Sequence, residues 1–245
     1  MAPDPPTLQP LSARSIVLSL LLGAHPPQMH VRHLLGAAGE FGVSESALRV
    51  ALTRMTSAGE LERTDGAYRL NARLLERQRR QDESINAPTL AWSGEWEQAV
   101  IVATGRTAAE RAQLRADLAR LRLAELREGV WMRPANLDRP WPVSPDRVLS
   151  RFIARPSESP QALVASLWDL AAWNAAADRL LQHFETATDP LVRLTAAAAI
   201  VHHLVGDPVL PPDLRPNDWL GDRLREAYAA YQAELIALAG SFREQ

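Results

Sequence analysis

The sequence contains no cysteine and no lysine, so all 27 of its Lys or Arg residues are arginines. Without cysteine there is neither a disulfide framework nor a Cys-based zinc site, which agrees with a reducing environment. The longest apolar run, Ile16 to Ala24, is far shorter than a membrane span. The proline-rich start contains an acid and lacks the basic segment of a signal peptide. These absences predict a cytoplasmic protein without a membrane partner.

Charge is nearly balanced along the 245 residues, with a formal net charge of −2, and the hydrophobic content of 47% is enough for a sizeable core. This balance argues against a wholly basic nucleic-acid binder, but a specific DNA-binding protein needs only a local basic footprint. Between Ser44 and Arg80 there are eight arginines against five acids. Because arginine suits bidentate contacts to guanine or phosphate, this stretch is the first candidate for a binding surface.

Residues 44–59 have the pattern of a DNA-recognition helix. Ser44 is a favourable N-cap, since its side-chain oxygen can accept from the free N–H groups of the first turn. Apolar residues at spacings of three and four form one stripe: Leu48, Ala51, Leu52, Met55 and Ala58. The opposite stripe can contact base edges and phosphates, and it carries Ser46, Arg49, Thr53 and Thr56, with Arg54 at its flank. The alternative is an ordinary amphipathic helix with solvated arginines.

A hairpin is predicted directly after this helix. Gly59 is placed to end the helix as its C′ residue, and Glu60 to Leu70 then predicts two strands joined by an Asp65-Gly66 turn. Arg63 and Arg69 flank the turn. A helix followed by a two-stranded hairpin of this kind is typical of a DNA-binding wing.

Two further helices precede the recognition helix. Ser12 begins one that ends at His25-Pro26-Pro27, and a second apolar stripe from Val31 stops near Phe41-Gly42. Three helices and a hairpin, in this order, predict a winged helix-turn-helix domain over residues 12–85. The domain includes a very polar helix, 71–82, expected to be a solvated connector, and residues 1–11 are expected to be a disordered tail.

The rest of the chain predicts two more domains. Over residues 86–156, strands near 99–103, 123–127, 130–133 and 148–154 and a helix over 107–121 indicate a ferredoxin-like α+β domain. Residues 157–245 have helical periodicity, with Asp189-Pro190 as a strong helix start. The fold class expected from the whole chain is therefore α+β and mostly helical.

Four segments, spread in order over nearly the whole chain, carry a resemblance to the PaaX family of bacterial transcriptional repressors. Each is short, and the combination is specific. They are Ser12-Ala13-Arg14-Ser15-Ile16; Gly42-Val43-Ser44-Glu45 with Arg49-Val50-Ala51-Leu52-Thr53-Arg54; Trp92-Ser93-Gly94-Glu95-Trp96; and Leu167-Trp168-Asp169-Leu170 with Asp207-Pro208, Pro211-Pro212-Asp213-Leu214 and Asp218-Trp219.

The resemblance implies a homodimer that represses a catabolic operon and releases its operator when an acyl-coenzyme A effector, such as phenylacetyl-coenzyme A, binds. Two recognition helices related by a two-fold axis predict a pseudo-palindromic DNA site. The sequence departs from the family in its lack of lysine and in a shortened, Ala-rich middle region. The effector's identity therefore does not follow from the resemblance.

Residues for an effector site are sought among aromatic walls and arginines, which suit an acyl or aryl group and phosphates. Trp131 and Arg133, with Trp168 and Arg193, are the candidates for such a site in an interdomain cleft. The alternative is that the tryptophans are packing anchors and the arginines are surface charges.

No constellation of catalytic or metal-binding residues is found in the sequence. His30 and His33 are three apart and His202 is next to His203, but no acid at matching spacing completes a ligand set. The middle region also resembles the small CRISPR adaptation nucleases, whose first strand ends in an acid, whereas here it ends in 102–105 without a carboxylate. We therefore expect no enzyme, metal or cofactor. The rival hypotheses are a metal-dependent nuclease or hydrolase and an adaptor that does not bind DNA.

Overall fold

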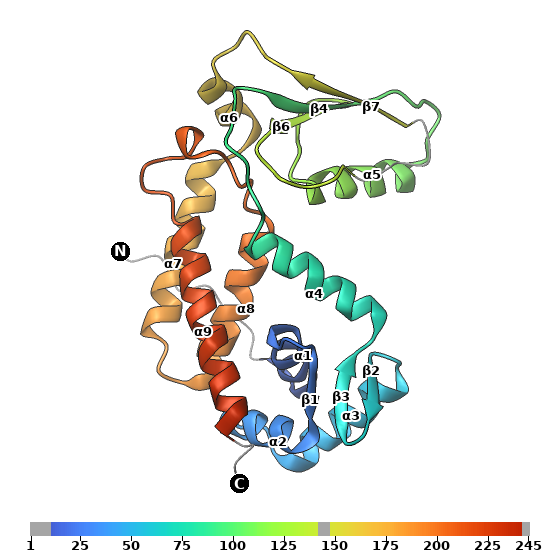
Figure 1. Cartoon of the computed structure of the whole chain (residues 1–245), viewed down its shortest axis with the longest axis vertical. Coiled ribbons are helices and arrows are strands. Elements are labelled where there is room, and N and C mark those ends of the chain that lie inside the picture. Colours follow the sequence, from blue (N-terminus) through green and yellow to red (C-terminus); the bar gives the residue numbers. More distant parts are fainter. Residues whose placement is uncertain (1–10, 142–147, 242–245) are drawn as a thin grey trace. The chain divides into compact units, whose positions relative to one another are not determined.

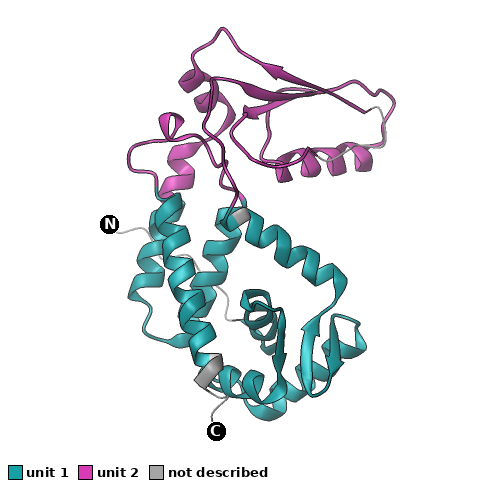
Figure 2. Ribbon diagram, in the orientation of Figure 1, with its two compact units in different colours: residues 1–86, 176–205, 220–245 teal, residues 87–175, 206–219 magenta. Residues whose placement is uncertain are grey.

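The computed structural model describes residues 11–141 and 148–241. The chain forms two compact units (Figure 2): unit 1 combines residues 1–86 with 176–205 and 220–245, and unit 2 contains 87–175 and 206–219. The predicted tail, 1–11, lies outside the described residues except for Leu11. The architecture is α+β and mostly helical with two antiparallel sheets, which confirms the predicted fold class.

The first three helices of unit 1 form as predicted (Figure 1): α1 (Ala13–Gly23), α2 (Val31–Glu40) and α3 (Glu45–Ser57), each in contact with the other two. Ser12 caps α1 by accepting from the backbone N–H of Ser15 at 3.2 Å. Gly42 makes the tight turn between α2 and α3 with a φ of +74°, a conformation that glycine adopts without steric cost. Leu34, Leu48 and Leu52 are buried at this junction.

The two-stranded wing hairpin forms as predicted, and a third strand that the sequence did not predict pairs with it. The strands β1 (Gln28–His30), β2 (Leu61–Thr64) and β3 (Ala67–Leu70) are antiparallel in the order β1-β3-β2. Asp65 and Gly66 both have positive φ, 47° and 79°, as a tight two-residue hairpin requires. The missed strand is three residues long and pairs only with residues 67–69, so it shows no local alternation.

The polar helix α4 (Ala72–Ile85) is buried along one side and is not a wholly solvated connector. Gln78 is 5% exposed, and its amide donates to the carbonyl oxygens of Leu22 at 2.8 Å and Ala24 at 3.0 Å. These carbonyls lie at the C-terminal end of α1, where no helical N–H can reach them. One buried glutamine therefore joins α4 to α1.

The C-terminal helices of unit 1 pack on these N-terminal elements. They are the end of α7 (Leu170–Thr186), α8 (Pro190–Val205) and α9 (Gly221–Ser241). From α9, Gln232 Nε2 donates to the carbonyl oxygen of Gly23 at 2.9 Å, and Arg225 Nε donates to that of Ile85 at 2.8 Å. Residues more than 130 positions apart thus belong to one unit.

Unit 2 is built on a four-stranded antiparallel sheet in the order β5-β6-β4-β7. The order matches a ferredoxin-like sheet. Its strands are β4 (Trp96–Ile101), β5 (Ala124–Arg127), β6 (Val130–Pro134) and β7 (Leu149–Ala154), and the helix α5 (Ala108–Arg120) follows β4. The strand expected over 99–103 spans 96–101 instead, and Trp96 at its start is fully buried.

The two faces of this sheet carry separate apolar clusters. On one face Ala99 and Trp131 pack with Leu118 of α5. On the other face Trp96 and Met132 pack with residues of α6 (Pro160–Leu167) and of the short 3-10 helix η1 (Pro212–Leu214). Among the described helices, none is both long enough and apolar enough for a bilayer span.

Candidate functional site

The burial pattern of α3 defines an outward face. Its buried side chains are Leu48, Ala51, Leu52 and Met55. At about 100° per residue, the line opposite to them runs through four exposed uncharged residues: Ser46, Val50, Thr53 and Ser57. Arg49 and Arg54 are exposed and lie on either side of this line. We call these six residues the α3 outward face. It combines small side chains at the centre with a guanidinium at each edge.

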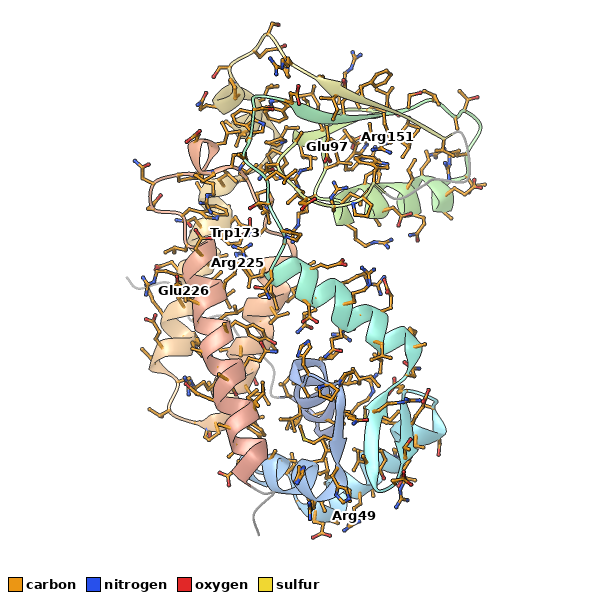
Figure 3. The ribbon with its side chains drawn as sticks, in the orientation of Figure 1. Arg49, Glu97, Arg151, Trp173, Arg225 and Glu226 are labelled. Atoms are coloured by element: carbon orange, nitrogen blue, oxygen red, sulfur yellow. The ribbon has the colours of Figure 1, made fainter. Side chains whose placement is uncertain are left out.

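Arg49 is partly held in place by its own helix. Its Nε donates to Glu45 Oε1 at 2.8 Å, and the two side chains are 57% and 64% exposed. Figure 3 shows Arg49 at the lower rim of unit 1. Because such an exposed pair contributes little to stability, the guanidinium can exchange the carboxylate for another anion at small cost.

The hydroxyl groups of α3 are bonded within the helix. Ser44 caps it by accepting from Ala47 N–H at 3.3 Å, and Ser44 and Ser46 hydroxyls lie 3.2 Å apart. Thr53 donates to Arg49 O at 2.9 Å and Thr56 donates to Leu52 O at 2.8 Å. These hydroxyls keep lone pairs to accept from an external donor. By helical position Thr56 lies at the edge of the outward face, on the side of Arg49.

The two predicted wing arginines lie on opposite faces of the wing. Arg63 is paired with Tyr68, which is buried, and its guanidinium carbon is 6.0 Å from the ring centroid. Arg69 is paired with Glu62 and its Nε donates to that carboxylate at 3.0 Å. Successive residues of a strand point to opposite faces, so a single surface laid against one face of the wing meets only one of the two.

Sequence reasoning missed two residues of the outward face, Ser57 and Val50, and the apolar one is Val50. It lies outside the apolar stripe and was therefore left out of both the core and the binding set. Its side chain is 50% exposed, a high value for a large aliphatic residue on this helix. The signal that could have found it is its position four residues after Ser46 and three before Thr53, which places it on the polar face.

Two of the predicted effector residues, Trp131 and Arg133, lie on β6 on the same face of the sheet. Trp131 is 6% exposed and packs in the cluster under α5. Arg133 is fully buried, and it donates to Pro134 O at 2.9 Å and to Asn136 Oδ1 at 2.7 Å. The pKa of Arg133 is lowered to about 9, chiefly by burial; Glu97 opposes this shift and the neighbouring Arg139 contributes to it. The side chain is still a cation at neutral pH.

The other two predicted effector residues, Trp168 and Arg193, do not lie on this face of the sheet. Trp168 packs against the cluster on the opposite sheet face, around Trp96. It also lines an open pocket of about 710 Å³ in unit 2, together with Leu170, Leu214 and Arg215. Arg193 belongs to α8 in unit 1, where it forms an ion pair with Glu234 at 2.6 Å. The structure therefore brings Trp131 and Arg133 to one face of the sheet and Trp168 to the other, whereas Arg193 belongs to unit 1.

The described residues contain no group of three His, Asp or Glu side chains that could hold a metal ion. His30 caps α2, since its Nδ1 accepts from Arg32 N–H at 3.4 Å. His33 is buried and accepts from Arg32 Nε at 3.1 Å. These two histidines have structural partners, although their rings lie 5.9 Å apart.

Three protein-family models match successive parts of the chain. Residues 12–74 match the model described as PaaX-like protein, residues 89–142 the PaaX protein central Cas2-like domain, and residues 168–245 the PaaX-like protein C-terminal domain. Among solved structures, uncharacterized protein Rv0674 from Mycobacterium tuberculosis is 44% identical, with a TM-score of 0.86 over 95% of this chain and 99% of that chain. No curated protein gives a significant sequence match.

Proposed function

Because the chain belongs to the PaaX family, whose members are transcriptional regulators, we propose that it is a ligand-responsive DNA-binding repressor. It acts as a homodimer on a pseudo-palindromic operator. The observation that carries this proposal is the α3 outward face, a row of small side chains between Arg49 and Arg54. The helix α3 follows the turn, which is the position of the recognition helix in a winged helix-turn-helix.

In this proposal α3 lies in the major groove and the wing lies over the adjacent backbone. Ser46, Arg49 and Thr53 contact base edges, with Arg49 leaving Glu45 for a guanine or a phosphate. The remaining residues contact phosphates and fix the orientation of the helix. They are Ser44, Arg54, Thr56 and one wing arginine, either Arg63 or Arg69, because these two lie on opposite faces of the wing.

The proposed effector is an acyl- or aryl-coenzyme A thioester such as phenylacetyl-coenzyme A. The pocket beside Trp168 has a size suited to the acyl or aryl group of such a ligand, and Arg215 supplies a cation in its wall. Trp131, Arg133 and Arg193 remain the other predicted effector residues. The effector releases DNA if it binds the DNA-incompetent arrangement of the dimer more tightly than the competent one.

The test is selection of duplexes from a random DNA library by the full-length protein, followed by mobility-shift titration of the selected site. We expect Arg49→Ala to weaken binding by about 10- to 100-fold, the value of one bidentate base contact. Arg223→Ala is the matched control, because Arg223 is 61% exposed and paired with Glu185 in the same unit. It should change the affinity less than twofold.

Three outcomes of this experiment contradict parts of the proposal. A protein that selects no duplex is not a DNA-binding repressor and fits an adaptor. Cleavage of the selected duplex in the presence of Mg²⁺ favours a nuclease. An unchanged affinity for Arg49→Ala removes Arg49 from the readout. Titration of the bound complex with coenzyme A thioesters tests the effector, since release of DNA is expected only for the cognate thioester.

A further inference from the structure

Val50 is an exposed aliphatic side chain at the centre of a polar helix face. Single exposed apolar residues are common on protein surfaces, so exposure alone carries no function. The position of Val50 is what distinguishes it, because Ser46 and Thr53 precede and follow it along the outermost line of α3. Val50 is 50% exposed, so it contributes little to the core beneath the helix.

Helix propensity also disfavours valine at this position. A β-branched residue in an exposed helix position is less favourable than alanine by several tenths of a kcal/mol. The side chain of Val50 forms no hydrogen bond and carries no charge that could support the helix dipole or an i,i+4 pair. Neither helix formation nor packing therefore accounts for a valine here.

The surroundings of Val50 allow a close approach to a flat surface. Ser46, Thr53 and Ser57 are all short, so no long side chain on the central line holds the helix away from a groove floor. Arg49 and Arg54 lie to the two sides, where a DNA duplex has its backbones. A short branched side chain at the centre then meets base edges, and its single stiff χ1 torsion reduces the entropy lost on contact.

The major groove presents one apolar group at the base edges of unmodified DNA, the C5-methyl group of thymine. We propose that Val50 is a specificity-determining residue that selects a thymine in each half-site by packing against this methyl group. The inference rests on the proposed DNA-binding function and deepens it. It assigns one base of the operator to a side chain that forms no hydrogen bond.

The experiment uses the site selected from the random library and replaces each thymine in turn by deoxyuridine, which lacks only the methyl group. For the wild-type protein, one position in each half-site should lose about fourfold in affinity, the value of one methyl group removed from water. Substitution in both half-sites should then cost about 16-fold. Val50→Ala should bind the thymine site more weakly and should be insensitive to deoxyuridine at that position.

Two further variants separate this contact from indirect effects. Val50→Thr keeps the shape of the side chain and one of its two methyl groups, so it should keep only part of the discrimination. Val205→Ala is the matched control, since Val205 is 49% exposed on α8. It should keep the wild-type response at every thymine. Thermal unfolding checks that each variant is folded.

The outcomes distinguish this inference from the function on which it rests. Selection of no duplex would overturn both. Selection of a duplex for which Val50→Ala keeps the wild-type response to deoxyuridine at every position would overturn the role of Val50 and leave DNA binding intact. A selected site without thymine would likewise overturn the role of Val50 and leave DNA binding intact. Loss of the response at one position per half-site, in Val50→Ala alone, establishes the contact.

Discussion

At the scale of the residue, Glu60 shows how one carboxylate holds three elements of the winged helix. It lies between α3 and β2 and its side chain is only 12% exposed. Arg14 at the start of α1 donates through Nε to Glu60 Oε2 at 3.0 Å, and Arg73 at the start of α4 lies 3.9 Å from Glu60 Oε1. The hydrogen bond from Arg14, and then the charges of Arg14 and Arg73, lower the pKa of Glu60.

This shift predicts a pH-dependent stability. A carboxyl group whose pKa is lower in the folded state stabilises the fold above its unfolded pKa and loses that contribution as the pH falls through the folded value. We expect Glu60→Gln to lower the free energy of unfolding at pH 7 by about 1 kcal/mol, or roughly 2–4 °C in Tm. The difference from wild type should shrink below about pH 4.

Thermal unfolding of both proteins between pH 3 and pH 7 measures this difference. Glu226→Gln is the control, because Glu226 is an exposed carboxylate on α9 (Figure 3). It should shift Tm little at any pH. A Glu60→Gln protein whose difference from wild type is the same at pH 3.5 and pH 7 would contradict the ion-pair account.

Arg133 is a residue whose partners explain its burial. Its guanidinium reaches Pro134 O and Asn136 Oδ1 on its own strand and the following turn, and Asn136 in turn donates to Val209 O at 3.0 Å. Val209 lies in the segment 206–219 that returns to unit 2. The buried cation therefore ties this segment to the sheet, a structural role that its place in the sequence does not indicate.

At the scale of the element, the wing depends on a strand that lies before α2. β1 pairs with β3 through Met29 and Tyr68, and its last residue, His30, lies against the turn at Gly66. A Cβ atom at Gly66 would lie 2.8 Å from His30 Nε2, whereas one at Gly59 would meet no atom within 4 Å. Both glycines have positive φ, 79° and 68°.

This pair of glycines predicts unequal costs for the same substitution. Gly59→Ala should lower the free energy of unfolding by about 1 kcal/mol, the cost of a left-handed conformation for alanine. Gly66→Ala adds displacement of His30 and should cost more, about 2 kcal/mol or above. Denaturant unfolding measures both values. An equal decrease in the free energy of unfolding for the two variants would mean that the His30 side chain moves aside at no cost and does not stabilise the turn.

At the scale of the whole molecule, unit 1 joins the N-terminal helices α1 to α4 and the C-terminal helices in one compact unit. Leu224 of α9 is fully buried, and the adjacent Arg225 bonds the last residue of α4. In such an arrangement a cavity in α9 should destabilise elements near the N-terminus, although they are far away in sequence.

We therefore predict that Leu224→Ala lowers the free energy of unfolding by about 2–5 kcal/mol, the usual cost of a leucine-sized cavity. Hydrogen exchange should become faster in α1 and α4 as well as in α9. Ile236→Ala is the control, because Ile236 is 54% exposed on the same helix. If exchange in α1 and α4 stays at the wild-type rate while α9 opens, the winged helix folds independently of the C-terminal helices.

Much of the fold could be predicted because the signals are local. Ser12 and Ser44 as N-caps, Gly42 and Asp65-Gly66 as turns, and the apolar stripe of α3 each depend on residues within one or two helical turns. The same local pattern identified the polar side of α3, and four short segments identified the family. These features depend on backbone conformation and periodicity, which neighbouring residues determine.

Only the tertiary structure decided the features that depend on distant partners. β1 exists because β3 lies beside it, and the buried side of α4 exists because Gln78 meets the open end of α1. The exposure of Val50 was established by the structure, although its spacing from Ser46 and Thr53 already placed it on the polar side of α3. Arg133 was predicted from the sequence as an effector residue, with a surface cation as the alternative. It is buried, and it donates to carbonyl groups of its own strand and of residue 209. Long-range pairing and burial are properties of the folded chain, and no local pattern encodes them.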